Sequence, residues 1–103
     1  MYGRMATYSF TGDGHELASR AEQGILPILQ AQPGFAGYTV AVGDGKIFSL
    51  SSWDSLADAE AGSKAVAGWV GENMNEIELI EVRYAEIMFS TAFGVTTKAG
   101  ATA

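Results

Sequence analysis

The residues that could bind or convert a small molecule gather around Trp69, in the second half of the chain. On a helical wheel, Trp69 lies about 95° from the centre of an apolar stripe, which is typical of an interface residue or a pocket wall. Its neighbours on the same predicted helix are small, namely Gly62, Ala65 and Gly68, and Asn73 follows one turn later. Small side chains beside a tryptophan leave room for a ligand between the helix and a sheet.

Two interpretations of this pattern are open. In the first, Trp69 is one wall of an apolar pocket between sheet and helices, and a tyrosine forms another wall. In the second, the small residues allow close helix packing, and Trp69 belongs to the core or to an interface. The first interpretation assigns catalysis to Trp69, Asn73 and Arg83, and substrate binding to Tyr38, Tyr84 and Val66.

Other kinds of site have weaker support. His15 is the only histidine, and it falls in the first turn of a predicted helix, where the helix dipole disfavours a charged imidazole. We interpret it as a surface residue. The acids Asp54, Asp58 and Glu60 lie near another helix start, so the dipole explains them better than a paired-carboxylate site does. Because the chain has no cysteine and no zinc or calcium spacing, we expect no metal and no cofactor.

Composition limits the partners and the surroundings. The 103 residues fit one domain and carry a net charge of −6, with only six scattered basic residues. Nucleic acid and anionic membrane surfaces are therefore not expected as partners, since both require clustered lysine and arginine. No apolar run approaches the roughly 20 residues that span a bilayer, and no signal peptide is apparent. The absence of cysteine is typical of a reducing compartment, so we expect a cytoplasmic protein.

The elements that must position these residues follow from periodicity and turn chemistry. Asp44-Gly45 predicts a two-residue hairpin turn, because glycine adopts positive φ freely and aspartate tolerates it. Asp13 and Ser55 are placed to cap two helices. The predicted order is strand, helix, strand, strand, helix, strand, over residues 2–10, 13–32, 38–42, 46–53, 56–77 and 79–90.

This βαββαβ order predicts an α+β, ferredoxin-like fold with a four-stranded antiparallel sheet and two helices on one face. We expect residues 1–93 to form this domain and residues 94–103 to be a flexible tail. The predicted helix-facing residues are Val40, Val42, Phe48, Leu50, Ile80, Val82 and Met88. The opposite face would carry Thr39, Ala41, Ser49, Ser51, Trp53, Glu81, Arg83 and Ile87, with Tyr8 as a further candidate. Because Trp53 and Ile87 would be poorly covered there, we expect a homodimer that packs sheet face to sheet face.

Four features of the sequence resemble the antibiotic biosynthesis monooxygenase superfamily of dimeric α+β barrels. They are Pro27 followed by Pro33-Gly34-Phe35-Ala36-Gly37-Tyr38, the Asp44-Gly45 hairpin, Ser51-Ser52-Trp53-Asp54-Ser55, and a final strand that ends near residues 86–90. The resemblance covers about residues 3 to 90. Members of this superfamily include cofactor-free quinone-forming oxygenases, haem-degrading enzymes and proteins with no known activity. Haem degradation is not expected here, because the second helix has no histidine and the first strand has no asparagine.

The resemblance implies a cofactor-independent monooxygenase that acts on a small aromatic or polyketide-like compound. In such a reaction, a carbanion formed from a phenolic substrate reduces O₂ directly. The base for this step is the weak point of the assignment, since no histidine–aspartate pair exists and tyrosine and asparagine are poor bases. The alternative is a non-catalytic dimer that binds a small molecule or serves in regulation.

Overall fold

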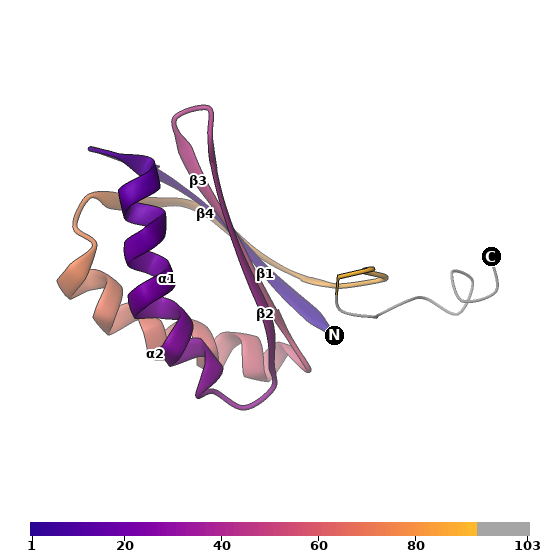
Figure 1. The fold of residues 1–103 in the computed structure, drawn as a ribbon. Coiled ribbons are helices and arrows are strands. Elements are labelled where there is room, and N and C mark those ends of the chain that lie inside the picture. Colours follow the sequence, from indigo (N-terminus) through magenta and orange to yellow (C-terminus); the bar gives the residue numbers. More distant parts are fainter. Residues whose placement is uncertain (93–103) are drawn as a thin grey trace.

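The computed structural model describes residues 1–92, which form a four-stranded sheet with both helices on one face (Figure 1). The strands lie side by side in the order β2-β3-β1-β4, and every neighbouring pair is antiparallel. The α+β, ferredoxin-like prediction is confirmed. The tail predicted at residues 94–103 lies outside the described residues. The elements are β1 (Tyr2–Phe10), α1 (Gly14–Gln30), β2 (Phe35–Gly43), β3 (Lys46–Trp53), α2 (Leu56–Asn73) and β4 (Ile77–Glu86).

Short-range chemistry sets the ends of these elements. The Asp13 carboxylate accepts a hydrogen bond from the His15 backbone N–H at 2.9 Å, and the Ser55 hydroxyl accepts one from the Asp58 N–H at 3.1 Å. Both predicted caps are therefore present, and each satisfies a backbone donor that the first helical turn leaves free. Asp44 and Gly45 adopt φ of 53° and 69°, as a two-residue hairpin turn requires.

The core lies between the sheet and the helices. Trp53 at the end of β3 is fully buried, and its indole N–H donates to the Ser51 hydroxyl at 2.9 Å. A Cβ atom at Gly62 would lie 2.1 Å from the Trp53 ring, so the glycine is what lets α2 rest directly on the indole. Side chains from α1, β3 and α2, with one residue just after α2, complete this core cluster, namely Leu17, Ala21, Ile25, Leu29, Ile47, Ala59 and Met74.

The position of Trp53 corrects the predicted strand faces. The helix-covered face of β3 carries Ile47, Ser49, Ser51 and Trp53, whereas Phe48 and Leu50 line grooves on the bare face. The assignment of β2 was right: Val40 is on the covered face, and Thr39 and Ala41 are on the bare one.

On β4 and just after it, the residues expected in the core, Ile80, Val82 and Met88, are 53%, 40% and 58% exposed. β4 is an edge strand, and the register with β1 shifts between Thr7 and Tyr8. This shift leaves Ile80 without a partner residue on β1, which is typical of a bulge.

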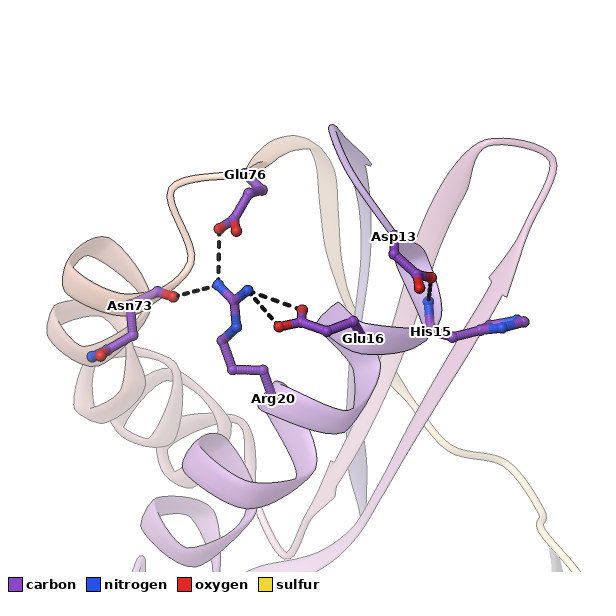
Figure 2. A network of polar contacts seen from close by, with 6 residues as sticks. All are labelled: Asp13, His15, Glu16, Arg20, Asn73 and Glu76. Carbon is purple, nitrogen blue, oxygen red and sulfur yellow. Dashed lines mark hydrogen bonds and ion pairs between the residues drawn. The ribbon is translucent and has the colours of Figure 1, made fainter.

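A partly exposed arginine ties the two helices together at one end (Figure 2). Arg20 of α1 donates to both Glu16 carboxylate oxygens at 2.7 and 2.9 Å, to Glu76 Oε1 at 2.9 Å and to the Asn73 backbone carbonyl at 2.9 Å. The Arg20 side chain, together with a backbone hydrogen bond, holds the pKa of Glu76 below its ordinary value. This contact fixes the end of α2 and the connection into β4 against α1. No helix among residues 1–92 has the length and apolar character to cross a membrane.

Candidate functional site

A cavity of about 50 Å³ lies on the covered face, between the sheet and both helices. Its walls are mainly apolar and come from α1 and α2, with Leu17, Ile25, Val66 and Val70 among them. Its floor is the sheet, which contributes Arg4, Tyr8, Tyr38, Ser49 and Ser51. An apolar chamber with a few polar groups on one side is the usual form of a small-molecule site.

The polar groups of the floor are arranged in a row across the sheet. Tyr38 of β2 pairs with Ser51 of β3, Ser51 pairs with Arg4 of β1, and Arg4 pairs with Tyr84 of β4. Directly paired residues on antiparallel strands point to the same face with Cβ atoms roughly 5 Å apart. These four residues, which we call the polar row, therefore cross all four strands on the side that the helices cover.

Arg4 is the cation of the polar row. Its Nη1 donates to the Tyr8 hydroxyl at 3.4 Å, and its Nε is buried without a hydrogen-bond partner among the described residues. Burial alone would lower the pKa of Arg4, but the hydroxyls of Tyr8 and Tyr84 hold that pKa above its ordinary value. Arg4 therefore stays charged at the edge of a largely apolar chamber.

Tyr38 separates the cavity from the outside. Together with Ala18 and Val40 it lines the cavity and also a surface groove of about 440 Å³ between α1 and β2, where His15 lies. Burial, with a smaller contribution from Tyr8, raises the pKa of Tyr38 to about 12. At neutral pH this phenol keeps its proton, so it can donate a hydrogen bond but is not available as a base.

The structure brings some of the residues predicted from sequence to this cavity. Tyr38 and Val66 line it, and Tyr84 lies beside Arg4 at the edge of the same floor. Trp69 does not line it: a Cβ atom at Gly24 would lie 1.9 Å from the Trp69 ring, so the indole rests on α1. The geometry of Trp69 is that of the second interpretation, in which small residues allow close helix packing.

The other two predicted residues lie apart from the cavity and from each other. The Asn73 side chain is exposed and donates to the Trp69 backbone carbonyl at 2.9 Å, one turn earlier in α2. Arg83 is 73% exposed on the bare face, where it pairs with Glu81. Trp69, Asn73 and Arg83 therefore do not form one constellation. No cluster of three histidine, cysteine, aspartate or glutamate residues suited to a metal occurs in residues 1–92.

The sequence analysis missed Arg4, Tyr8, Ser49 and Ser51. A signal was present in β1, because Arg4 is the only charged residue of that strand and Tyr8 has the same parity. The two serines were predicted on the uncovered face together with Trp53. Because this face assignment of β3 was wrong, the serines were not considered as site residues.

Comparison with known proteins gave matches by structure only: no protein-family model matches the sequence, and no curated protein matches it. MupZ from Pseudomonas fluorescens aligns with 81% of this chain at a TM-score of 0.70 and 8% identity, and the chain spans 65% of the length of MupZ. A candidate antibiotic biosynthesis monooxygenase from Chloroflexus aurantiacus aligns with 90% of the chain at a TM-score of 0.65 and 23% identity, covering 98% of its own length.

SnoaB, a cofactor-independent oxygenase from Streptomyces nogalater, aligns with 87% of the chain at a TM-score of 0.66 and 14% identity, over 95% of its own length. A dimeric ferredoxin-like protein from an uncultured marine organism aligns with 87% of the chain at a TM-score of 0.65 and 10% identity, over 97% of its own length. Identities this low establish the fold. The chain thus has the ferredoxin-like fold of the antibiotic biosynthesis monooxygenase-like proteins, as the resemblance in its sequence predicted.

Proposed function

We propose that the protein binds a small aromatic compound in the cavity on the covered face and oxidises it with O₂, without a cofactor. The observation that carries this proposal is the apolar chamber with the polar row on its floor, since it can hold a flat ring and present hydrogen-bond donors to its oxygen atoms. The shared fold with SnoaB, which is a cofactor-independent oxygenase, supports the same reaction class.

The proposed reaction needs an electron-rich substrate that loses a proton easily. Its carbanion form transfers electrons to O₂ and binds it, which gives a peroxide at the reacting carbon. The O–O bond then breaks, so that one oxygen atom becomes a new carbonyl oxygen and the other leaves as water with the two hydrogens that the reacting carbon carries in the keto form of the substrate. Among the groups that line the cavity, the phenol of Tyr38 is placed to donate a hydrogen bond to the substrate oxygen, and the apolar walls limit the access of water.

The size of the cavity bears on the substrate. A volume of about 50 Å³ is well below the ~300 Å³ typical of ligand pockets. A ring therefore enters only if α2 moves away from the sheet. The sequence of α2 favours such movement, because its buried residues are only Ala59 and Gly62, while Gly68 and Gly71 face open space. Each of these two glycines costs the helix about 1 kcal/mol relative to alanine.

Oxygen consumption tests this proposal. We expect uptake with one-ring dihydroxybenzenes first and with anthrone more slowly, because the three-ring compound requires the larger opening. Tyr38→Phe should lower the rate, whereas His15→Ala, in the outer groove, should leave it unchanged. Trp69→Phe and Asn73→Ala in the same assay test the catalytic roles that the sequence suggested for those residues. Flat oxygen traces with every substrate would contradict an oxygenase.

One observation favours a second candidate, a non-catalytic small-molecule-binding protein. No carboxylate or imidazole is among the described residues that line the cavity, so the site offers no ordinary general base. This candidate predicts saturable ligand binding together with flat oxygen traces. Binding is read from the fluorescence of Trp53, which forms part of the cavity wall.

We also propose that a second copy of the chain covers the bare face of the sheet. Met5 and Phe48, each 42% exposed, stand on this face with Leu50 between two grooves of about 420 and 300 Å³. Exposed apolar residues gathered on a flat sheet are typical of an interface. A two-fold pairing would bring the same patch from both copies together.

Light scattering on the purified protein tests the pairing. We expect a dimer for the wild type and a monomer for Phe48→Glu, which would place charges inside the interface. Gln30→Glu adds the same charge to an exposed position of α1 and should leave the dimer intact. A monomeric wild type at high concentration, or a dimeric Phe48→Glu variant, would contradict the proposal.

A further inference from the structure

Arg4 differs from the other arginines of the chain in having no carboxylate partner. Arg20 pairs with Glu16 and Glu76, and Arg83 pairs with Glu81, whereas Arg4 makes no ion pair with any residue in 1–92. The chain as a whole carries 12 acidic residues against six basic ones, so acids are plentiful. None of them lines the cavity among the described residues. Among residues 1–92, Arg4 is therefore the one cation that lines the cavity, and no anion lines the cavity with it.

The hydrogen bonds of Arg4 leave donors unused. A guanidinium carries five N–H donors in a planar fork. One of them meets the neutral Tyr8 hydroxyl at a long 3.4 Å, and the buried Nε has no acceptor among residues 1–92. A half-buried charge with an orphaned donor is unfavourable unless something else completes it.

From this geometry we infer that the ligand of the cavity carries a planar carboxylate conjugated to its ring, which Arg4 binds. This rests on the proposed function only in placing the ligand in the same cavity. A guanidinium fork suits two oxygen atoms in one plane better than it suits a spherical anion. Arg4 is the anion-binding residue, and it selects ionised aromatic compounds over neutral ones of the same shape.

The neighbours of Arg4 in the polar row fit such a ligand. Ser51 and Tyr38 continue the row into the cavity, and the raised pKa of Tyr38 keeps its hydroxyl protonated as a donor. A cavity of about 50 Å³ holds a group of three or four non-hydrogen atoms, at roughly 10–15 Å³ for each water-sized group. A carboxylate is of that size, so the anion occupies the existing space while the ring requires the opening beside α2.

Benzoate and benzamide are the probes that test this inference, because they have the same shape and differ in charge. Titration followed by tryptophan fluorescence should show benzoate binding the wild type at least ten-fold more tightly than benzamide. Arg4→Met should remove this preference and should change the affinity for benzamide little. Arg83→Met makes the same change of net charge on the bare face and should keep the preference.

Arg4→Lys provides a second variant that retains the charge and serves if the methionine variant does not fold. It should keep part of the preference for benzoate, because it attracts the anion without the planar fork. Equal affinity of the wild type for the two probes would overturn the inference, as would a preference that survives in Arg4→Met. The oxygenase proposal fails separately: flat oxygen traces alongside a benzoate preference would leave an anion-binding site without catalysis.

Discussion

Ile47 and Phe48 are neighbours in β3 and face opposite sides of one sheet. Ile47 is buried beneath the helices, next to the cavity, while Phe48 is 42% exposed on the bare face. Both faces carry large apolar residues. The bare face also carries Arg83, which pairs with Glu81, whereas the covered face carries Arg4, without an ion pair among residues 1–92, in a row with two tyrosines and a serine. The comparison indicates that the two faces have different roles. The covered face encloses the candidate site, and the bare face is the one that we propose to pack against another copy of the chain.

The largest expected effect is the difference in stability between alanine variants of Ile47 and Phe48. Ile47→Ala should lower the free energy of unfolding by roughly 2–5 kcal/mol, because it leaves a cavity in the packed core. Phe48→Ala should cost the isolated chain no more than about 1 kcal/mol, since much of its ring is already in water. Urea unfolding at low protein concentration measures both. A larger loss for Phe48→Ala would reverse the assignment of the two faces.

A second pair probes how tightly α2 rests on the covered face. Gly62→Ala places a methyl group 2.1 Å from the buried Trp53 ring, so we expect a net loss of roughly 1–3 kcal/mol. Gly68→Ala, on the same helix, meets nothing within 4 Å and should stabilise the protein by about 1 kcal/mol. Opposite shifts in the urea midpoint would support the close contact. If Gly62→Ala were also stabilising, α2 would not lie on Trp53 as described.

Alkaline pH should weaken the covered face specifically. Burial raises the pKa of Tyr38 from 10.0 to about 12, so the folded protein holds this proton more tightly than the unfolded chain does. The stabilisation is fully present below pH 10 and is lost as pH rises through 12, by about 2–3 kcal/mol in all. Unfolding of wild type and Tyr38→Phe between pH 9 and 12 isolates this contribution. Parallel pH profiles for the two proteins would contradict it.

The smallest effect is expected at the exposed network around Arg20. Arg20→Ala should cause only a small loss of stability, seen best at low salt, because its contacts are open to solvent, and Arg83→Ala should cause a still smaller one. The pKa of Glu76 is lowered in the folded protein. The stabilisation that Glu76 contributes is therefore present above its unfolded pKa and is lost as pH falls through its folded pKa. A cost for Arg20→Ala that does not shrink in 1 M salt would argue against an electrostatic origin.

Most of the fold could be predicted from the sequence, because local signals set it. Asp13, Ser55 and the Asp44-Gly45 turn define helix starts and the hairpin through contacts a few residues apart. The faces of β3 were harder. Its two sets of alternate residues each contain large apolar side chains, Ile47 and Trp53 on one and Phe48 and Leu50 on the other, so hydropathy does not choose between them.

The candidate site was predicted only in part for the same reason. Tyr38 was proposed as a pocket wall on the strand that follows the first helix, and Val66 was proposed because it lies on the apolar stripe of α2. Arg4 and Ser51 are 47 residues apart in the sequence, and only the register between β1 and β3 brings them together. The sequence left the two interpretations of Trp69 open because Gly24, the residue against which its ring packs, lies on the other helix.

Methyl resonances recorded while benzoate is added to the wild type test the central claim most directly. The covered face should respond: we predict saturable shifts for Val40, Val66 and Val70, which line the cavity. The bare face provides the internal control, and the methyl signals of Met5 and Leu50 should stay in place. Shifts confined to Met5 and Leu50, or no saturable shift at any of these methyl groups, would contradict the account.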